Sequence, residues 1–267
     1  MPGNGEDDPG TKYGPFDDAE PDFHDAEYSS FHTESKICGT CHNVKHVAFG
    51  TDIETTYTEW EQGPYHSKDP EKSITCQGCH MYQRPGVPAT GSTERPENPG
   101  SAAEDSMERE HIFTHYFVGA NRFIPDRVGD KTKADMAEER LKNAATLTIA
   151  EDPSVHRNLK ITVKNTGAGH SIPTGVSDTR QVWLRITATD ETGKTTYISG
   201  NLDKNGYLPQ NALAYKTVFG DGKGNPVSNI AKAREILSDH RIAPLASVTE
   251  TIKLPDGVTK NSTIHVQ

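Results

Sequence analysis

Two short cysteine strings constrain this chain more than any other feature. The pattern C-x-x-C-H occurs at residues 38–42 and again at residues 76–80. Together the two strings contain all four cysteines of the 267-residue chain. No cysteine is therefore left to act as a separate nucleophile or to form a disulfide with a distant segment. The residues concerned are Cys38, Cys41 and His42 in the first string, and Cys76, Cys79 and His80 in the second.

Three interpretations compete for these strings. A four-cysteine zinc site accepts C-x-x-C pairs, but the separation between the pairs is longer than in the usual zinc ribbon. The second interpretation is two disulfide or dithiol pairs. Neither the zinc nor the disulfide interpretation explains why a histidine, His42 or His80, follows each pair. In the third, each cysteine pair forms thioethers to a haem, and the adjacent histidine binds the iron from one face. Only this interpretation uses every residue, so we predict two covalently bound haem c groups with His42 and His80 as proximal ligands.

The second axial ligand of each iron is expected to be a histidine. The chain has four methionines, of which Met1 is terminal and Met81 directly follows a proximal histidine, so it cannot reach the opposite face of the same porphyrin. Twelve histidines are present, and ten of them compete for the two remaining positions. Bis-histidine ligation is the prediction, and residue type alone does not choose among the ten.

Composition and charge limit the classes of function that the chain can have. Hydrophobic residues make up 32% of the chain and the mean hydropathy is −0.73, which is low unless porphyrins fill part of the core. The formal net charge of −10 argues against nucleic acid or an anionic membrane as partner. No apolar run is long enough to span a bilayer. The start of the sequence shows no secretory signal. Since haem is attached in this way outside the cytoplasm, we expect a mature periplasmic or extracellular chain.

The distribution of residue types along the sequence predicts a mixed fold in three parts. Residues 1–30 are rich in Gly, Pro and acidic residues and predict an extended arm. Residues 31–146 predict an irregular, sparsely helical dihaem region, with helices starting at a Thr51–Glu54 capping box and at about 132–146. Residues 147–267 alternate apolar and polar side chains, which predicts an antiparallel, immunoglobulin-like β-sandwich. A helix is also expected at about 229–238.

The order of several strings resembles a known family. "SKICGTCHNV", "TYTEWEQGPY", "ITCQGCHM", "HYFVGANRF", "NTGAGHSIPTG", "QVWLRITATD" and "SDHRIAP" follow one another along the chain. They resemble multihaem c-type cytochromes of the cytochrome c554-related and extracellular group. The resemblance implies an extended haem region followed by a β-sandwich that carries a G-H-x-x-P-T-G string. It also implies distal iron ligands at His24, His115 and His170, with His24 either serving this chain or donated to a neighbouring subunit.

Local sequence supports two of these three histidines. His170 lies in a glycine-flanked loop that lets the backbone approach a flat ligand closely, and an exposed turn is the alternative. His115 lies among aromatic residues suited to line a porphyrin. His111 precedes it by one helical turn and could substitute for it, although in a helical segment both could not easily serve one iron.

Electron transfer is the function expected from this pattern. Two haems with histidine on both faces leave no open iron position for substrate. We therefore predict an electron-transfer protein rather than an enzyme, acting with redox partner proteins, other cytochromes or, through filament formation, its own copies. The alternative is a haem enzyme acting on a small nitrogen or oxygen species at a five-coordinate iron. A third class, a structural role of the sandwich in a surface assembly, is compatible with the first.

Overall fold

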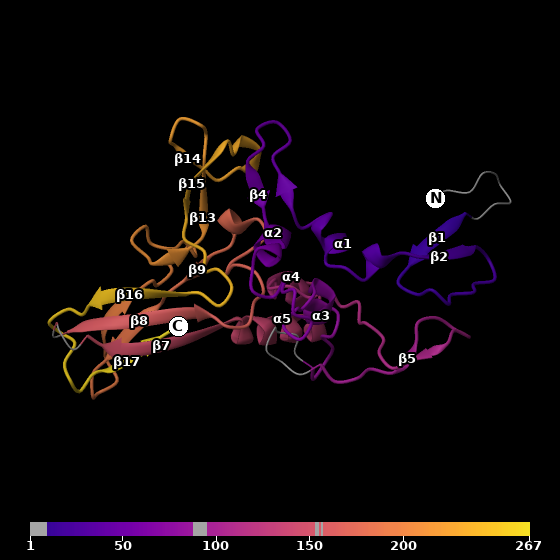
Figure 1. Cartoon of the computed structure of the whole chain (residues 1–267). Coiled ribbons are helices and arrows are strands. Elements are labelled where there is room, and N and C mark those ends of the chain that lie inside the picture. The colour runs from indigo at the N-terminus through magenta and orange to yellow at the C-terminus, as the bar shows by residue number, and fades with distance from the viewer. Residues whose placement is uncertain (1–9, 88–94, 153–154, 156) are drawn as a thin grey trace. The chain divides into compact units, whose positions relative to one another are not determined.

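A computed structural model describes residues 10–87, 95–152, 155 and 157–267, so the expectations for residues 1–9 lie outside the described part. The fold is mixed and sparsely helical, with antiparallel strands in several small sheets, as predicted (Figure 1). Contacts divide the chain into two units, one of residues 1–43 and 57–144 and the other of residues 44–56 and 145–267. The three-part division expected from the sequence, and the sandwich in particular, stay predictions.

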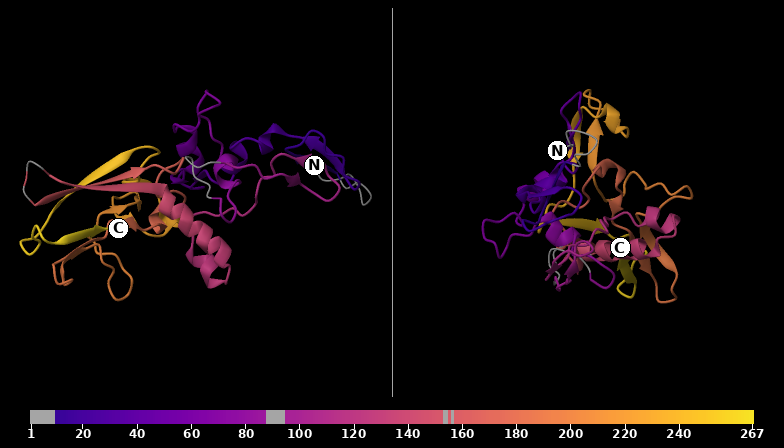
Figure 2. Two further views of the ribbon diagram at one scale, coloured as in Figure 1. Left: turned by 90° about the horizontal axis from the view of Figure 1, so that it is seen from below. Right: turned by 90° about the vertical axis from the view of Figure 1, so that its right-hand side faces the viewer.

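The first unit is built from short elements joined by long connections. Its strands β1 and β2 form a parallel pair, and β5 and β6 form an antiparallel pair. The pair of β1 and β2 lies at the far end of this unit from α5 (Figures 1 and 2). The elements are β1 (Thr11–Gly14), β2 (Asp25–Tyr28), η1 (Ser30–His32), α1 (Lys36–Gly39), α2 (Thr56–Glu61), α3 (Cys76–His80), β5 (Gly100–Ser101), β6 (Glu108–Arg109), α4 (Phe123–Arg127) and α5 (Lys131–Ala144).

The N-terminal arm is attached to the β5–β6 hairpin. Arg109 of β6 forms an ion pair with Asp18, and its guanidinium lies 4.3 Å from the ring centroid of Phe16. The helix expected at 132–146 is confirmed as α5, which ends at Ala144 because Ala145 begins strand β7. Met136 and Ala137 of α5 pack against Val118 in a small apolar cluster.

The second unit consists of antiparallel strands. The sheet orders are β16-β8-β7, β11-β10-β17 and β14-β13-β15, together with the two-stranded pairs β12-β9 and β3-β4. Its elements are β3 (Val44–Lys45), β4 (Asp52–Glu54), β7 (Ala145–Glu151), β8 (Asn158–Asn165), η2 (Ser177–Thr179), β9 (Val182–Trp183), β10 (Ile186–Thr189), β11 (Thr195–Ser199), β12 (Ala214–Tyr215), β13 (Thr217–Gly220), β14 (Pro226–Val227), η3 (Ile230–Lys232), β15 (Glu235–Asp239), β16 (Ser247–Lys253) and β17 (Thr263–Val266).

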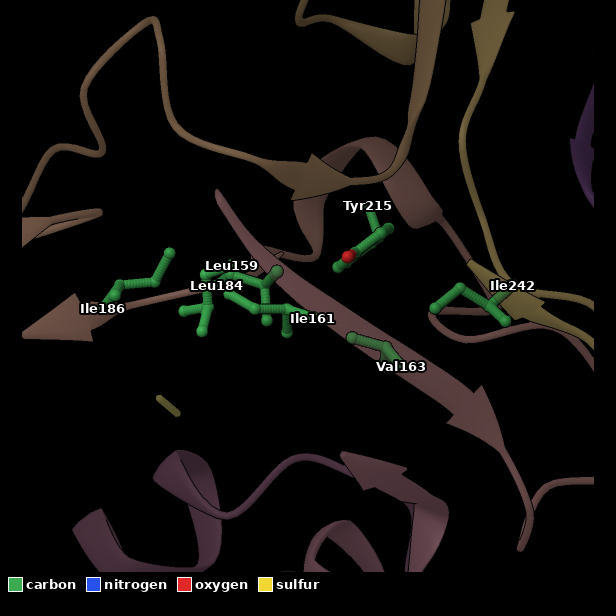
Figure 3. Packing of buried hydrophobic residues seen from close by; sticks show 7 residues of the cluster. All are labelled: Leu159, Ile161, Val163, Leu184, Ile186, Tyr215 and Ile242. Carbon is green, nitrogen blue, oxygen red and sulfur yellow. The ribbon is translucent and has the colours of Figure 1, made fainter. Parts of the chain in front are cut away.

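The core of the second unit follows from the alternation along β8. Leu159, Ile161 and Val163 are buried, while the residues between them are only partly covered. Successive side chains of a strand point to opposite faces, so this alternation places one apolar face inward. The other buried members of the cluster come from β10, β12 and the loops (Figure 3): Leu184, Ile186, Tyr215 and Ile242.

One expected helix begins later than predicted, and another is wrong. Asp52–Glu54 form strand β4 and pair with β3, and α2 begins only at Thr56. Ile53 packs with Phe219 and Ala233 in the second unit instead of sharing a helical face with Trp60. The segment at 229–238 contains the short η3 and then β15, because β15 pairs with β13. In both segments, pairing with another strand overrides local helix propensity.

No helix in the described part of the chain is long and apolar enough to cross a membrane.

Candidate haem-attachment site

Each cysteine pair lies on a short helical turn that brings its two thiols to one side. In the first string, α1 contains Cys38 and is continued by the turn to His42, whose N–H donates to the Cys38 carbonyl at 2.9 Å. In the second string, α3 spans the whole motif from Cys76 to His80. Residues three apart on a helix share a face, so both sulfurs of a pair can reach one flat ligand. The histidine that follows is then positioned next to the same ligand.

The two motifs are joined through the start of α3. The backbone N–H of Cys76 donates to Ser35 Oγ at 2.9 Å, and Ser35 is only 2% exposed. The Gln77 amide donates to the carbonyl of Glu34 at 2.8 Å and to that of His32 at 3.3 Å. These bonds satisfy groups that the end of a helix otherwise leaves without partners. The first string therefore cannot move away from the second without exposing buried polar atoms.

The same contact brings one cysteine of each string together. The Cys76 thiol hydrogen-bonds to the sulfur of Cys38, and this bond lowers the pKa of Cys38 to about 7. The bond to Cys38, together with burial, raises the pKa of Cys76 above its ordinary value. All four cysteines are free thiols. Within the described ranges, no group of three or more His, Cys, Asp or Glu side chains is arranged to hold a metal ion.

Gly39, between the cysteines of the first string, allows a close approach by an aromatic ring. A Cβ at this position would lie 2.7 Å from Cγ of Tyr57, closer than real Cβ contacts permit. The Tyr57 N–H donates to the His42 carbonyl at 2.9 Å, so the ring cannot simply move away. Gly39 and Tyr57 together therefore set the position of the turn that carries His42.

Replacing Gly39 by alanine is expected to destabilise the first string by about 1–3 kcal/mol, the usual cost of overpacking. Thermal unfolding of the haem-loaded protein and the yield of attached haem would both fall. Gly78→Ala is the matched control, since a Cβ there meets nothing nearer than 3.4 Å. The double variant Gly39→Ala/Tyr57→Ala should recover stability; if it does not, steric contact with Tyr57 is not the cause.

The structure places His115 at the edge of an open hollow. The hollow has a volume of about 320 Å³ and is also lined by Tyr116 and Lys133. The His115 side chain is exposed and makes an edge contact with Phe117 at 5.5 Å between centroids. Phe117 is 64% exposed and has a φ of 47°, a left-handed conformation that is rare for a bulky residue. An exposed imidazole beside exposed aromatic rings suits a flat apolar ligand.

His111 lies close by but in a different setting. The segment around it is not helical, so the one-turn spacing to His115 does not apply. Its ring stacks on Tyr82 with centroids 3.9 Å apart, and both ring nitrogens are buried without a hydrogen-bond partner. Burial lowers the pKa of His111, and the charge of Arg84 lowers it further. From the sequence, His115 is the predicted ligand and His111 the alternative. Only the structure shows that both ring nitrogens of His111 are buried without a hydrogen-bond partner.

The other two predicted ligands lie in different parts of the fold. His24 precedes β2 in the arm, and its Nδ1 is 3.0 Å from the Asp25 carbonyl oxygen. His170 belongs to the second unit, where its carbonyl accepts a bond of 2.8 Å from the fully buried Asn165 amide. Asn165 also accepts from Ala168 N–H at 3.1 Å, so this one side chain shapes the glycine-flanked loop. The ligand roles of His24, His115 and His170 stay predictions.

The donor set fits covalent haem. Each thiol pair shares a helical face with a following histidine, which is the arrangement required for two thioethers and one axial imidazole. His111 and His32 carry buried ring nitrogens without hydrogen-bond partners, although neither is among the predicted ligands. Phe113, Phe117 and Phe123 are exposed apolar rings in the same part of the chain.

Comparisons with known proteins give a likeness of fold. No family model matches the chain, and neither does any curated protein sequence. A crystal structure of a penta-haem cytochrome c552 from Thermochromatium tepidum superposes with a TM-score of 0.56 at 18% sequence identity. The match covers 93% of this chain and 52% of the other, so the chain spans about half the length of that cytochrome. The chain therefore has a multihaem c-type cytochrome fold.

Proposed function

We propose that this chain is a c-type cytochrome that relays electrons through two covalently attached haems. Cys38 and Cys41 would tether one haem and Cys76 and Cys79 the other, with His42 and His80 as proximal ligands. When bound, each haem supplies a one-electron iron couple. The protein provides the tethers, the axial imidazoles and the packing that keeps the two groups at a fixed separation.

The hydrogen bonds that join the two cysteine strings are the observation that carries this proposal. Thioether bonds at the two strings would therefore tether two haems to segments that are held together. Ser35 and Gln77 keep the two motifs together through bonds of 2.9 and 2.8 Å. Two haems held together in this way favour electron exchange within the chain. Two haems that act independently would not need their attachment strings to be joined.

Distal ligation by His115 at one haem and by His170 at the other completes the proposal. Imidazole on both faces leaves no iron position for a substrate, which favours electron transfer over catalysis. His24 is the remaining candidate for a distal ligand. It binds the iron of a haem either in its own chain or in a neighbouring subunit. Phe23, beside it, is 85% exposed, so the arm presents an apolar side chain to a second copy in a filament.

The partners we propose are other cytochromes and redox proteins outside the cytoplasm, in the periplasm or the extracellular space. With a net charge of −10, the chain favours a partner with a basic docking surface. Association with such a partner should weaken as salt is added, because exposed charges are screened.

Electron paramagnetic resonance of the oxidised, haem-loaded protein tests the proposed function. Two low-spin ferric haems are expected, with signals broadened by coupling between neighbouring irons. A high-spin haem that shifts on addition of cyanide or nitrite would contradict the proposal and support the alternative, a haem enzyme acting on a small nitrogen or oxygen species. Two sharp, uncoupled low-spin signals would contradict the adjacent placement of the haems.

A further inference from the structure

Two arginines lie beside the second cysteine string. Arg95 Nε donates to the Gly78 carbonyl at 2.6 Å, and its Nη2 lies 4.0 Å from the sulfur of Cys79. Arg140 of α5 also acts on this thiol: burial raises the pKa of Cys79, and the charges of Arg95 and Arg140 oppose that rise. The tether of the second haem therefore lies in a positive local field.

Arg140 is held in place by a completely buried glutamine. Gln83 is 0% exposed; its amide oxygen accepts from Arg140 Nη2, and its amide nitrogen donates to the Met136 carbonyl at 3.1 Å. Thr114 fixes the backbone of Gln83 through a bond of 2.6 Å to its carbonyl. A buried glutamine with bonds on both sides of its amide is a rigid support for the guanidinium.

Among the described residues, no carboxylate forms an ion pair with Arg140. Neither Arg140 nor Arg95 forms an ion pair with a carboxylate in the described part of the chain, and Arg140 Nε is buried without an acceptor. Burial lowers the pKa of Arg140 to about 10, so the side chain is still charged at neutral pH. A thioether at Cys79 cannot ionise, which removes the one thiolate that could have offset the charge.

Carboxylates lie near the first string. The ring of Tyr57, which lies against Gly39, donates from its hydroxyl to Glu61 at 3.1 Å. Burial raises the pKa of Tyr57, and the hydrogen bond to Glu61 and the charges of Glu61, Cys76 and Glu34 raise it further. Lys36, Glu34 and Glu61 are all exposed to solvent, where their charges are screened. The guanidinium groups of Arg95 and Arg140 near the second tether are less exposed than these charges.

We propose that Arg140, positioned by Gln83, raises the reduction potential of the haem tethered at Cys76 and Cys79 above that of the haem tethered at Cys38 and Cys41. Positive charge near a haem favours the reduced iron, which carries one positive charge fewer, and net local charge is one of the factors that set haem potentials. Electrons entering at the first haem would then pass to the second. This inference rests on the proposed function and adds a direction to it.

Redox titration of haem-loaded variants tests the inference, after the haem count of each has been measured. Arg140→Met should lower the higher of the two potentials, with about a tenfold change in the equilibrium constant for reduction, equal to about 59 mV for one electron. The lower potential should stay nearly constant. Arg140→Lys should keep most of the wild-type value, and Arg122→Met, which removes an exposed arginine paired with Glu138, should change neither potential.

A second variant keeps the test decisive if Arg140→Met attaches haem poorly. Gln83→Glu places a carboxylate against Arg140 without removing it, and should also lower the higher potential alone. A shift confined to the lower potential, or no shift in either variant, would overturn the inference. Two attached haems with unchanged potentials would leave the proposed function intact, whereas absence of haem would overturn the proposed function itself.

Discussion

Replacing both Cys76 and Cys79 by alanine is expected to leave a chain that carries one covalent haem instead of two. The two thioethers of a haem c come from a single C-x-x-C-H string, so removing one pair should remove one haem and spare the other. The intact mass should fall by one haem beyond the change in the side chains. The haem absorbance per chain should halve.

The reciprocal variant Cys38→Ala/Cys41→Ala should give the same count. Ser35→Ala is the control, because it removes the bond of Ser35 to Cys76 N–H and leaves all four thiols in place. It should retain both haems. If either double variant loses both haems while the Ser35 variant keeps both, the two attachments are interdependent. If the wild-type chain binds zinc and carries no covalent haem, the haem interpretation is wrong.

Replacing His115 by alanine is expected to convert one of the two haems from low spin to high spin. Loss of the distal imidazole leaves that iron five-coordinate, and the exposed hollow beside Tyr116 and Lys133 gives solvent and small ligands access. The visible spectrum should show a high-spin band from half of the haem. Added imidazole should restore the low-spin spectrum, which separates loss of the ligand from loss of structure.

His111→Ala provides the matched comparison. His111 is buried against Tyr82, with both ring nitrogens lacking a partner, so it is the competing ligand. We expect this variant to keep both haems low-spin. A high-spin haem in the His111 variant, together with an unchanged spectrum for His115→Ala, would assign the ligand to His111 and contradict the prediction for His115.

Local sequence predicted the parts of the fold that depend on local pattern. The alternation in residues 158–165 fits β8, where Leu159, Ile161 and Val163 are buried, and the helical spacing near residue 136 fits α5. It failed at residues 52–54 and 235–239, where backbone pairing with β3 and β13 determines the structure. Strand β3 is close in sequence but short, and β13 precedes β15 by a longer connection, so the local helical pattern revealed neither pairing.

The candidate site could likewise be predicted from the sequence only in part. Both C-x-x-C-H strings could be recognised directly, because every ligand in them is adjacent along the chain. The contact of Cys38 with Cys76 and the support of Arg140 by Gln83 could not, since each joins segments more than thirty residues apart. Likewise, the uncommitted nitrogens of His111 are visible only once Tyr82 has been placed against its ring.

The central claim is that the four cysteines bind haem, and a haem count tests it most directly. Purified protein would be examined by intact mass and by the pyridine haemochrome spectrum, with a reduced-minus-oxidised visible spectrum of the same sample. The account predicts two covalently attached haems per chain and sharp bands on reduction. A mass equal to that of the bare polypeptide, with zinc bound or disulfides between the cysteines, would contradict it.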